Sequence, residues 1–133
     1  MNRKVLVIDD EQSVRNAFML ALEDTGSDVD TAENGSTGLE KFRNGSYDLV
    51  FLDLKMPVMD GATALRRIRE LDQSVPVYIV TAFHQEYFAE LKEAQRDGIN
   101  FELLHKPVSG DDIRLVVEAA LGGTAAREDK VDG

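Results

Sequence analysis

The sequence predicts an α/β fold, in which a doubly wound parallel sheet carries helices on both of its faces. Short apolar runs rich in Val and Ile alternate along the chain with segments whose apolar residues recur at helical spacing. Strands that are apolar throughout are typical of parallel sheets, because helices cover both faces of such sheets. Right-handed crossovers are expected between successive strands. These observations predict a single domain of five strands and five helices.

The strands are expected at the apolar runs that are too short for a helix, which are residues 5–8, 28–32, 47–53, 77–80 and 101–105. A helix is expected after each strand, and several polar residues are placed to cap these helices. Asn34 and Asp60 precede the second and third helices as N-caps. Ser109 and Asp112 have the spacing of a capping box at the start of the last helix.

The composition limits the classes of function. The 133 residues are 43% hydrophobic and 30% charged, as in an ordinary globular domain. The formal net charge of −10 disfavours direct binding to nucleic acid or to an anionic membrane surface. The absence of cysteine excludes thiol catalysis and thiolate metal sites. No segment reads as a signal peptide or a membrane span, so a cytoplasmic protein is expected.

The chain is expected to divide into a domain and a short tail. Residues 1–123 contain all of the predicted strands and helices. Residues 124–133 are polar and show no periodicity, so they are expected to form a flexible C-terminal tail.

Polar side chains occur where the predicted strands end. Asp9 and Asp10 follow the first strand, Asp53 ends the third, Thr81 ends the fourth and Lys106 follows the fifth. Each residue alone has an ordinary reading, because acids favour helix N-termini and lysines are usually solvated. The carboxyl ends of parallel strands, however, lie at one edge of a sheet, where such folds bind their ligands. We therefore expect these five side chains to lie together.

That combination of side chains suits phosphoryl transfer. Three neighbouring carboxylates repel one another, and a hard divalent cation such as Mg²⁺ (or Mn²⁺) relieves the repulsion. Lys106 adds a compact positive charge for a phosphate oxygen, and Thr81 adds a hydroxyl donor. A carboxylate nucleophile, a metal, a cation and a hydrogen-bond donor are the parts that such chemistry uses.

Four motifs together resemble one known family. They are VLVIDDE, LVFLDLKMPVMDG, IVTA and HKP, in that order along the chain. Residues 4–121 thereby resemble the receiver domain of two-component and phosphorelay response regulators. The resemblance implies a single flavodoxin-like (βα)5 domain with strand order 2-1-3-4-5, like the chemotaxis regulators. It also implies a signalling switch that catalyses only its own aspartyl phosphorylation and dephosphorylation.

The resemblance gives each polar residue a role. Asp53 is expected to accept the phosphoryl group. The expected metal ligands are Asp10 directly, Asp9 through water, Asp53 itself and the backbone carbonyl of Lys55. Thr81 would be the switch hydroxyl and Lys106 the lysine that contacts the phosphate. A cis peptide bond is expected before Pro107.

The resemblance also implies partners and the surfaces that they contact. The phosphodonor would be a histidine kinase or a histidine phosphotransfer protein, and the output would pass to a downstream protein, with a phosphorylation-dependent dimer as a further form. The donor surface is expected at Gln12, Val14, Arg15, Phe18, Pro107 and Val108. The output surface is expected at Tyr87, Leu91 and Leu103. Leu103 stands where the family often has an aromatic residue. In place of the usual coupling between Thr81 and that ring, the signal is expected to leave through the helix at 87–91 and the strand at 103–105 by another rearrangement.

Three other functions are alternatives to the phosphorylated signalling switch. A degenerate receiver could act as a phosphate-independent interaction module, and Leu103 favours that reading. A haloacid-dehalogenase-type phosphatase would need an acid at position 55, where this chain has Lys55. A flavodoxin-like FMN carrier would need a phosphate-binding loop after the first strand, where this chain has acids. The chain could be a single-domain regulator or a receiver from a larger protein.

Overall fold

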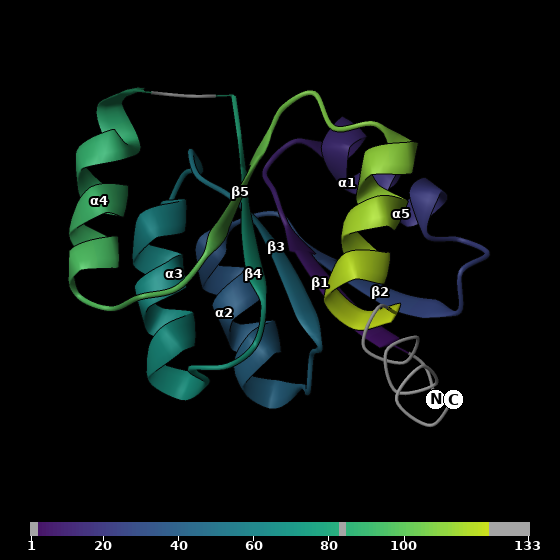
Figure 1. The fold of residues 1–133 in the computed structure, drawn as a ribbon, viewed down its shortest axis with the longest axis horizontal. Helices are drawn as coiled ribbons and strands as arrows, with labels where there is room; N and C mark the ends of the chain where they lie inside the picture. Colours follow the sequence, from purple (N-terminus) through teal and green to yellow (C-terminus); the bar gives the residue numbers. More distant parts are fainter. Residues whose placement is uncertain (1–2, 83–84, 123–133) are drawn as a thin grey trace, which may run out of the picture.

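The computed structural model describes residues 3–82 and 85–122, and the predicted tail at 124–133 lies outside them. The strands are β1 (Arg3–Ile8), β2 (Ser27–Ala32), β3 (Leu49–Asp53), β4 (Val77–Thr81) and β5 (Glu102–His105). They form one parallel sheet with the order β2-β1-β3-β4-β5 (Figure 1). The helices are α1 (Gln12–Ala21), α2 (Gly35–Asn44), α3 (Gly61–Leu71), α4 (Phe88–Arg96) and α5 (Gly110–Val117). The predicted fold class and strand order are confirmed.

Helices cover both faces of the sheet, and each face buries its own hydrophobic cluster. Successive residues of a strand point to opposite faces. Leu6 and Ile8 of β1 accordingly pack with residues of α2, α3 and α4, whereas Val5 and Val7 pack with residues of α1 and α5. Figure 1 shows the two groups of helices on opposite sides of the sheet. All four of these β1 side chains are at most 1% exposed, which explains why the strand is apolar at every position.

The predicted caps are present at the helix starts. The Asn34 and Asp60 side chains each accept a hydrogen bond at 2.8 Å from the backbone N–H three residues further on. Ser109 and Asp112 form the predicted capping box at the start of α5. Each cap satisfies an N–H group that has no partner inside its helix, so these residues fix where α2, α3 and α5 begin.

Two strands begin later than the sequence suggests. Tyr47 precedes β3, and its hydroxyl donates a hydrogen bond of 2.7 Å to Asp30 instead of continuing the strand. Phe101 precedes β5 and packs against the core on the α2–α4 side. β5 is an edge strand, and its Leu103 side chain is 47% exposed. Edge strands lack a neighbour on one side, so fewer of their residues are buried.

Two residues expected on partner surfaces belong to the core, and these expectations are corrected. Phe18 on α1 is 1% exposed, and its ring lies 4.7 Å from that of Phe51, centroid to centroid. Leu91 on α4 is 5% exposed and belongs to the cluster on the opposite face. Each residue lies with other apolar residues at helical spacing, and such an apolar stripe faces the core, which here means the sheet. A partner can sense these two residues only through their neighbours.

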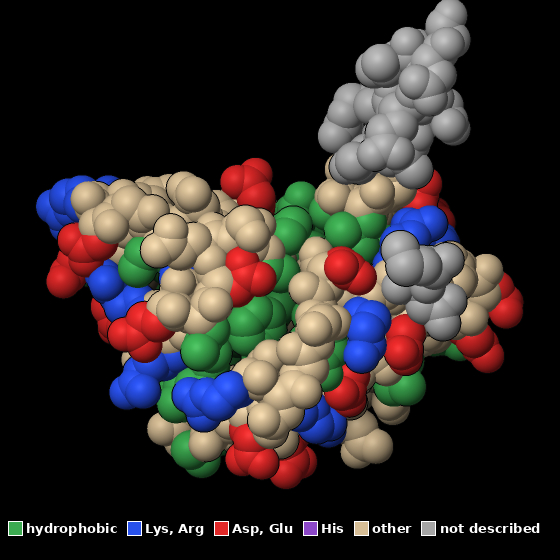
Figure 2. Space-filling view, turned by 90° about the horizontal axis from the view of Figure 1, so that it is seen from below, with side chains coloured by type: hydrophobic (Ala, Val, Ile, Leu, Met, Phe, Trp, Pro, Cys, Tyr) green, Lys and Arg blue, Asp and Glu red, His purple; other side chains and the backbone are tan. Residues whose placement is uncertain are grey.

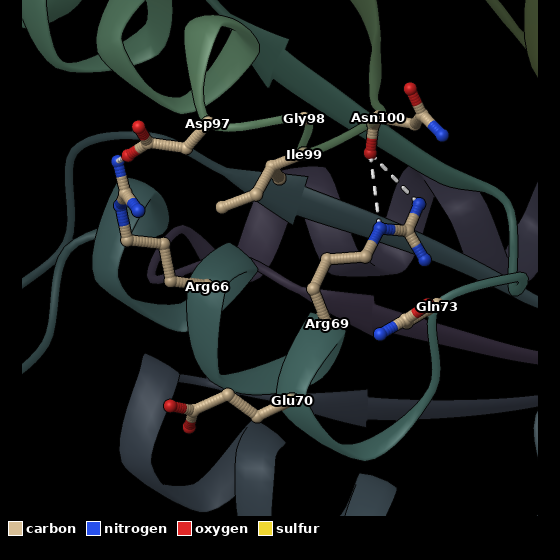
Figure 3. Close-up of a pocket in the computed structure, with 8 residues that line it drawn as sticks. All are labelled: Arg66, Arg69, Glu70, Gln73, Asp97, Gly98, Ile99 and Asn100. Carbon is tan, nitrogen blue, oxygen red and sulfur yellow. Dashed lines mark hydrogen bonds and ion pairs between the residues drawn. The ribbon is translucent and has the colours of Figure 1, made fainter.

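Arg69 on α3 is a buried charge that the sequence analysis did not identify. Its guanidinium donates hydrogen bonds to the backbone carbonyls of Asn100, Val75 and Asp72, over 2.7–3.2 Å. Figure 3 shows the Arg69 side chain reaching the segment that joins α4 to β5. A pocket of about 440 Å³ lies beside it. Because every one of these acceptors is a backbone oxygen, Arg69 ties α3 to two loops at the end of the sheet where the strands begin.

The end of the molecule where the strands begin carries both acidic and basic side chains. Figure 2 looks onto it and shows an apolar strip bordered by acidic and basic side chains. A pocket of about 380 Å³ lies in this region, and its lining includes Val75, Pro76, Phe101 and Ala120.

Within residues 3–82 and 85–122, no helix has the length and hydrophobicity needed to cross a membrane.

Candidate functional site

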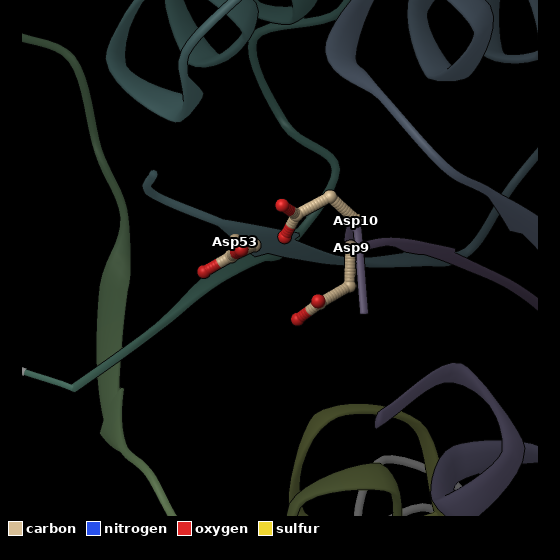
Figure 4. Close-up of side chains that lie close together, drawn as sticks. All are labelled: Asp9, Asp10 and Asp53. Atoms are coloured by element: carbon tan, nitrogen blue, oxygen red, sulfur yellow. The ribbon is translucent and has the colours of Figure 1, made fainter. Parts of the chain in front are cut away.

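Three carboxylates meet at the carboxyl ends of β1 and β3. Asp9, Asp10 and Asp53 each place a carboxylate oxygen within 4.8 Å of the others (Figure 4). Asp9 and Asp53 are buried, whereas Asp10 is exposed. Asp10 and Asp53 line a pocket of about 420 Å³, whose lining also includes Lys55 and Lys106. The expected gathering of acids at this edge of the sheet is present.

Local hydrogen bonds hold the Asp9 side chain in place. Its backbone N–H donates to the carbonyl of Ala32 at 3.0 Å, which continues the pairing of β1 with β2. Its Oδ1 accepts a hydrogen bond of 2.9 Å from the backbone N–H of Glu11, at the start of α1. Arg15, one turn into α1, donates to the Asp9 carbonyl at 2.6 Å. The turn from β1 into α1 therefore fixes both the backbone and the carboxylate of Asp9.

Gly61 explains the glycine of the MPVMDG motif. A Cβ atom at this position would lie 2.3 Å from the carbonyl oxygen of Asp53 and 2.7 Å from the Cα of Leu54. The Gly61 N–H donates to the Leu54 carbonyl at 2.8 Å, so the start of α3 packs directly on the end of β3. The Asp53 Oδ1 accepts a hydrogen bond of 2.9 Å from the Leu54 N–H. The absence of a side chain at position 61 allows the backbone of the Asp53 loop to take this path.

Lys106, which follows the edge strand β5, also contacts the acidic cluster. Its backbone N–H donates to the Thr81 carbonyl at 2.8 Å, and the bond to Pro107 is cis, as expected. Its Nζ lies 3.1 Å from Asp9 Oδ2, 3.1 Å from Glu11 Oε1 and 3.3 Å from Asp53 Oδ1. Burial lowers the pKa of Lys106, but attraction to these carboxylates outweighs burial and leaves the pKa raised. The ammonium therefore stays charged.

The carboxylates are nevertheless under electrostatic strain. Burial, followed by repulsion from Asp9, raises the pKa of Asp53 to about 7, although Lys106 acts in the opposite direction. Burial also raises the pKa of Asp9 above its ordinary value. One ammonium does not compensate for the desolvation and crowding of these acids. A divalent cation would do so, and it would leave Asp53 ionised at neutral pH.

The donor set fits Mg²⁺. Every side-chain ligand candidate is a carboxylate oxygen, and Mg²⁺ prefers oxygen ligands while keeping several waters. The exposed position of Asp10 and the pocket beside it leave room for those waters. Lys55, whose backbone carbonyl is the remaining candidate ligand, lines the same pocket.

Thr81 and the residues expected on contact surfaces differ in their exposure and in their distance from this pocket. Thr81 is 1% exposed at the end of β4, and Ala82 after it lines the pocket. Gln12 and Pro107 are exposed, whereas Val14, Arg15 and Val108 are half-buried. Tyr87, the last residue of the 3-10 turn Gln85–Tyr87, lines the pocket, so it is placed at the site and not on a distant face. Leu103 lies on the exposed edge of β5.

The raised pKa of Asp53 predicts how stability depends on pH. The folded protein keeps a proton on Asp53 up to about pH 7, whereas the ordinary pKa is 3.8. In Mg²⁺-free buffer the free energy of unfolding is therefore expected to fall as pH rises between these values. Asp53→Asn should remove this loss and raise the free energy of unfolding at pH 8 by up to about 4 kcal/mol. Urea unfolding at pH 5 and pH 8 measures it, with the exposed Asp24→Asn as the control; identical pH profiles for wild type and Asp53→Asn would contradict it.

Comparison with known proteins identifies the family. The response regulator receiver domain family matches residues 5–118. The chain belongs to this family. Receiver domains of response regulators serve phosphorylation-dependent signalling, bind Mg²⁺ at an acidic pocket and interact with histidine kinases and downstream effectors. They are signalling switches and not metabolic enzymes.

Individual relatives agree with the family assignment. The chain is 36% identical over 118 residues to the regulatory protein AtoC of Escherichia coli. The matched region covers 89% of this chain but only 25% of AtoC. The structure of response regulator TrrA from Thermotoga maritima, in complex with Mg²⁺-BeF, matches with a TM-score of 0.75 and 33% identity, over 90% of this chain and 99% of TrrA. The chemotaxis protein CheY4 of Vibrio cholerae gives a TM-score of 0.79 at 26% identity, over 91% of this chain and 100% of CheY4.

Proposed function

We propose that this receiver is a phosphorylation-dependent switch in which Asp53 accepts a phosphoryl group from a histidine kinase or a histidine phosphotransfer protein. The observation that carries the proposal is the meeting of Asp9, Asp10 and Asp53 within 4.8 Å, with Lys106 Nζ 3.3 Å from Asp53. This arrangement supports the roles of a nucleophile, a metal site and a cation around one pocket. The TrrA structure, a complex with Mg²⁺-BeF, supports the binding of the same kinds of ligand here.

The proposed reaction is an in-line displacement at phosphorus. A carboxylate oxygen of Asp53 forms the new P–O bond while the P–N bond of the phosphohistidine breaks, and the electron pair stays on the imidazole nitrogen. Asp10, Asp53, the Lys55 carbonyl and, through water, Asp9 would hold Mg²⁺ (or Mn²⁺), which would supply charge neutralisation when bound. Lys106 donates hydrogen bonds to the transferred group, which spreads charge over its oxygens. The receiver thus catalyses its own phosphorylation and, with water as the nucleophile, its own dephosphorylation.

The switch is proposed to start at Thr81. A phosphoryl group on Asp53 adds nearly two negative charges and new acceptor oxygens, toward which the Thr81 hydroxyl can move. Strand β5 has Leu103 at the usual aromatic position, and this side chain is 47% exposed. The nearby Phe101 precedes β5 and packs against the core. We infer that the change reaches the surface through Tyr87, which lines the pocket, and through β5. Unchanged positions of both Tyr87 and Leu103 with and without beryllofluoride would contradict this route.

The partners are proposed from exposure and charge. Gln12, Val14 and Arg15 at the start of α1, with Pro107 and Val108, would form the surface for the phosphodonor. The output would be a downstream protein or a phosphorylation-dependent dimer, in the cytoplasm. Direct contact of this domain with nucleic acid is disfavoured by its net charge of −10.

A second candidate function is a phosphate-independent interaction module. The exposed Leu103 at the usual aromatic position favours it, because the usual phosphate-driven rearrangement has no ring to move. The meeting of Asp10, Asp53 and Lys106 favours the switch. Thr81, whose carbonyl accepts a hydrogen bond from the Lys106 N–H, completes the expected set.

Intact-mass measurement separates the two functions. We expect the receiver to gain one phosphoryl group when it is incubated with Mg²⁺ and acetyl phosphate. The gain should be absent in Asp53→Ala and in the presence of EDTA. No gain from acetyl phosphate or from a phosphorylated phosphotransfer protein, with Mg²⁺ binding confirmed, would favour the interaction module.

A further inference from the structure

The Lys106 ammonium has more partners than its proposed task requires. An ammonium carries three N–H donors. Three carboxylates lie around this one, with Asp9, Glu11 and Asp53 oxygens at 3.1, 3.1 and 3.3 Å from Nζ. Phosphorylation neutralises the Asp53 carboxylate, so the N–H donor that contacts Asp53 passes to the phosphoryl group. A further donor of Lys106 reaches the phosphoryl group only if the carboxylate of Asp9 or of Glu11 gives way. The identity of that carboxylate determines how readily Lys106 reaches the phosphoryl group.

Glu11 differs from the other two partners of Lys106. Its side chain is 57% exposed, whereas those of Asp9 and Asp53 are 3% and 7% exposed. Glu11 occupies the N-cap position of α1, but its carboxylate accepts no capping hydrogen bond from the described residues of that helix. Its contact to Lys106 spans 95 residues of sequence. Glu11 also lines the pocket, although it belongs to none of the proposed metal ligands.

We propose that Glu11 is a positioning residue that holds Lys106 in the unphosphorylated receiver and releases it to the incoming phosphoryl group. The inference rests on the proposed function of Asp53. Water can replace Lys106 around the exposed Glu11 carboxylate at small cost, whereas a buried carboxylate would lose a partner that solvent does not replace. Glu11 is therefore the partner that yields. Glu11 withholds a donor of Lys106 from the transferred group and adds negative charge beside the pocket, so it slows the reaction with anionic phosphodonors.

The rate of phosphorylation tests this role. Glu11→Gln is expected to increase the rate constant for phosphoryl gain from acetyl phosphate, at saturating Mg²⁺, by about threefold to tenfold. The increase should shrink between 20 mM and 500 mM added salt, because salt screens an exposed charge. Glu33→Gln is the matched control, since Glu33 is an exposed acid that follows β2 at the same edge of the sheet. Glu11→Ala serves as the second variant and should give the same direction.

The Lys106 ammonium gives a readout that does not depend on turnover. In nitrogen-15 NMR spectra, the Lys106 Nζ signal of the unphosphorylated protein should shift in Glu11→Gln and stay unchanged in Glu33→Gln. With Mg²⁺ and beryllofluoride bound, wild type and Glu11→Gln should give the same Lys106 signal, because the contact with Glu11 is then broken in both.

The possible outcomes separate this inference from the proposed function. If wild type is phosphorylated and Glu11→Gln reacts at the same rate, the inference is overturned. Equal acceleration by Glu33→Gln also overturns it, because net charge alone would then explain the effect. If wild type gains no phosphoryl group from acetyl phosphate or from a phosphorylated phosphotransfer protein, the proposed function fails instead. An unchanged Lys106 signal in Glu11→Gln would then overturn the contact itself.

Discussion

Lys106→Ala is expected to reduce the rate of phosphoryl gain on Asp53 by about a hundredfold or more. The Lys106 ammonium lies 3.3 Å from Asp53 and is the cation placed to neutralise charge on the phosphoryl oxygens. It acts within a partly buried site, since its side chain is 16% exposed, so water is a poor substitute. Rates of intact-mass change with acetyl phosphate and Mg²⁺ measure the effect.

The same substitution should affect stability in a way that identifies its cause. Without Lys106, the Asp9 and Asp53 carboxylates lose their counter-charge, which is expected to cost about 1–3 kcal/mol of unfolding free energy in Mg²⁺-free buffer at pH 8. Added Mg²⁺ should restore much of this loss. The exposed Lys92→Ala on α4 is the control and should change neither quantity. A phosphorylation rate within threefold of wild type in Lys106→Ala would show that another group neutralises the phosphoryl charge.

Gly61→Ala is expected to destabilise the fold by about 1–3 kcal/mol and to disturb the site at the same time. The added Cβ would lie 2.3 Å from the carbonyl oxygen of Asp53, a contact that only a backbone shift can relieve. That shift would move the loop that carries Asp53 and the Lys55 carbonyl. Urea unfolding and Mg²⁺ affinity, by titration calorimetry, are the measurements.

Gly110→Ala is a matched control for Gly61→Ala. Gly110 is also the first residue of its helix, but the atoms nearest to an added Cβ would be two side-chain nitrogens of Arg114, at 3.3 and 3.6 Å, and the Ala21 Cβ at 3.7 Å. A flexible arginine can move, and alanine favours helix over glycine, so stability should be unchanged or slightly higher. If both variants had the same small effect, the close packing of α3 on the Asp53 loop would not be the reason for glycine at position 61.

Much of the fold could be predicted from the sequence, because local pattern and topology agree. Uninterrupted apolar strands require helices on both faces, and this requirement identifies the parallel sheet. Asn34 and Asp60 cap their helices as predicted, since capping depends on residues only three positions apart. The site edge was predictable for a similar reason, because parallel strands bring their carboxyl ends together.

The remaining features depend on packing between distant segments. The apolar stripes that contain Phe18 and Leu91 favour burial, whereas the resemblance assigned both residues to partner surfaces. The packing of α1 and α4 against the sheet shows that both belong to the core. Arg69 is indistinguishable in sequence from a solvated helix arginine, and only the loops near Asn100 and Val75 reveal its role. The ion pair of Glu11 with Lys106 joins residues 95 positions apart, and no local pattern predicts it.

The most direct test of the account is to locate the phosphoryl group in the chain. Sodium borohydride reduces an aspartyl phosphate to homoserine, which peptide mass spectrometry assigns to one residue. After incubation with acetyl phosphate and Mg²⁺, we expect homoserine at position 53 alone, and none when EDTA replaces Mg²⁺. Homoserine at Asp9 or Asp10, or a phosphoryl group gained with Asp53 unmodified, would contradict the assignment of Asp53 as the acceptor.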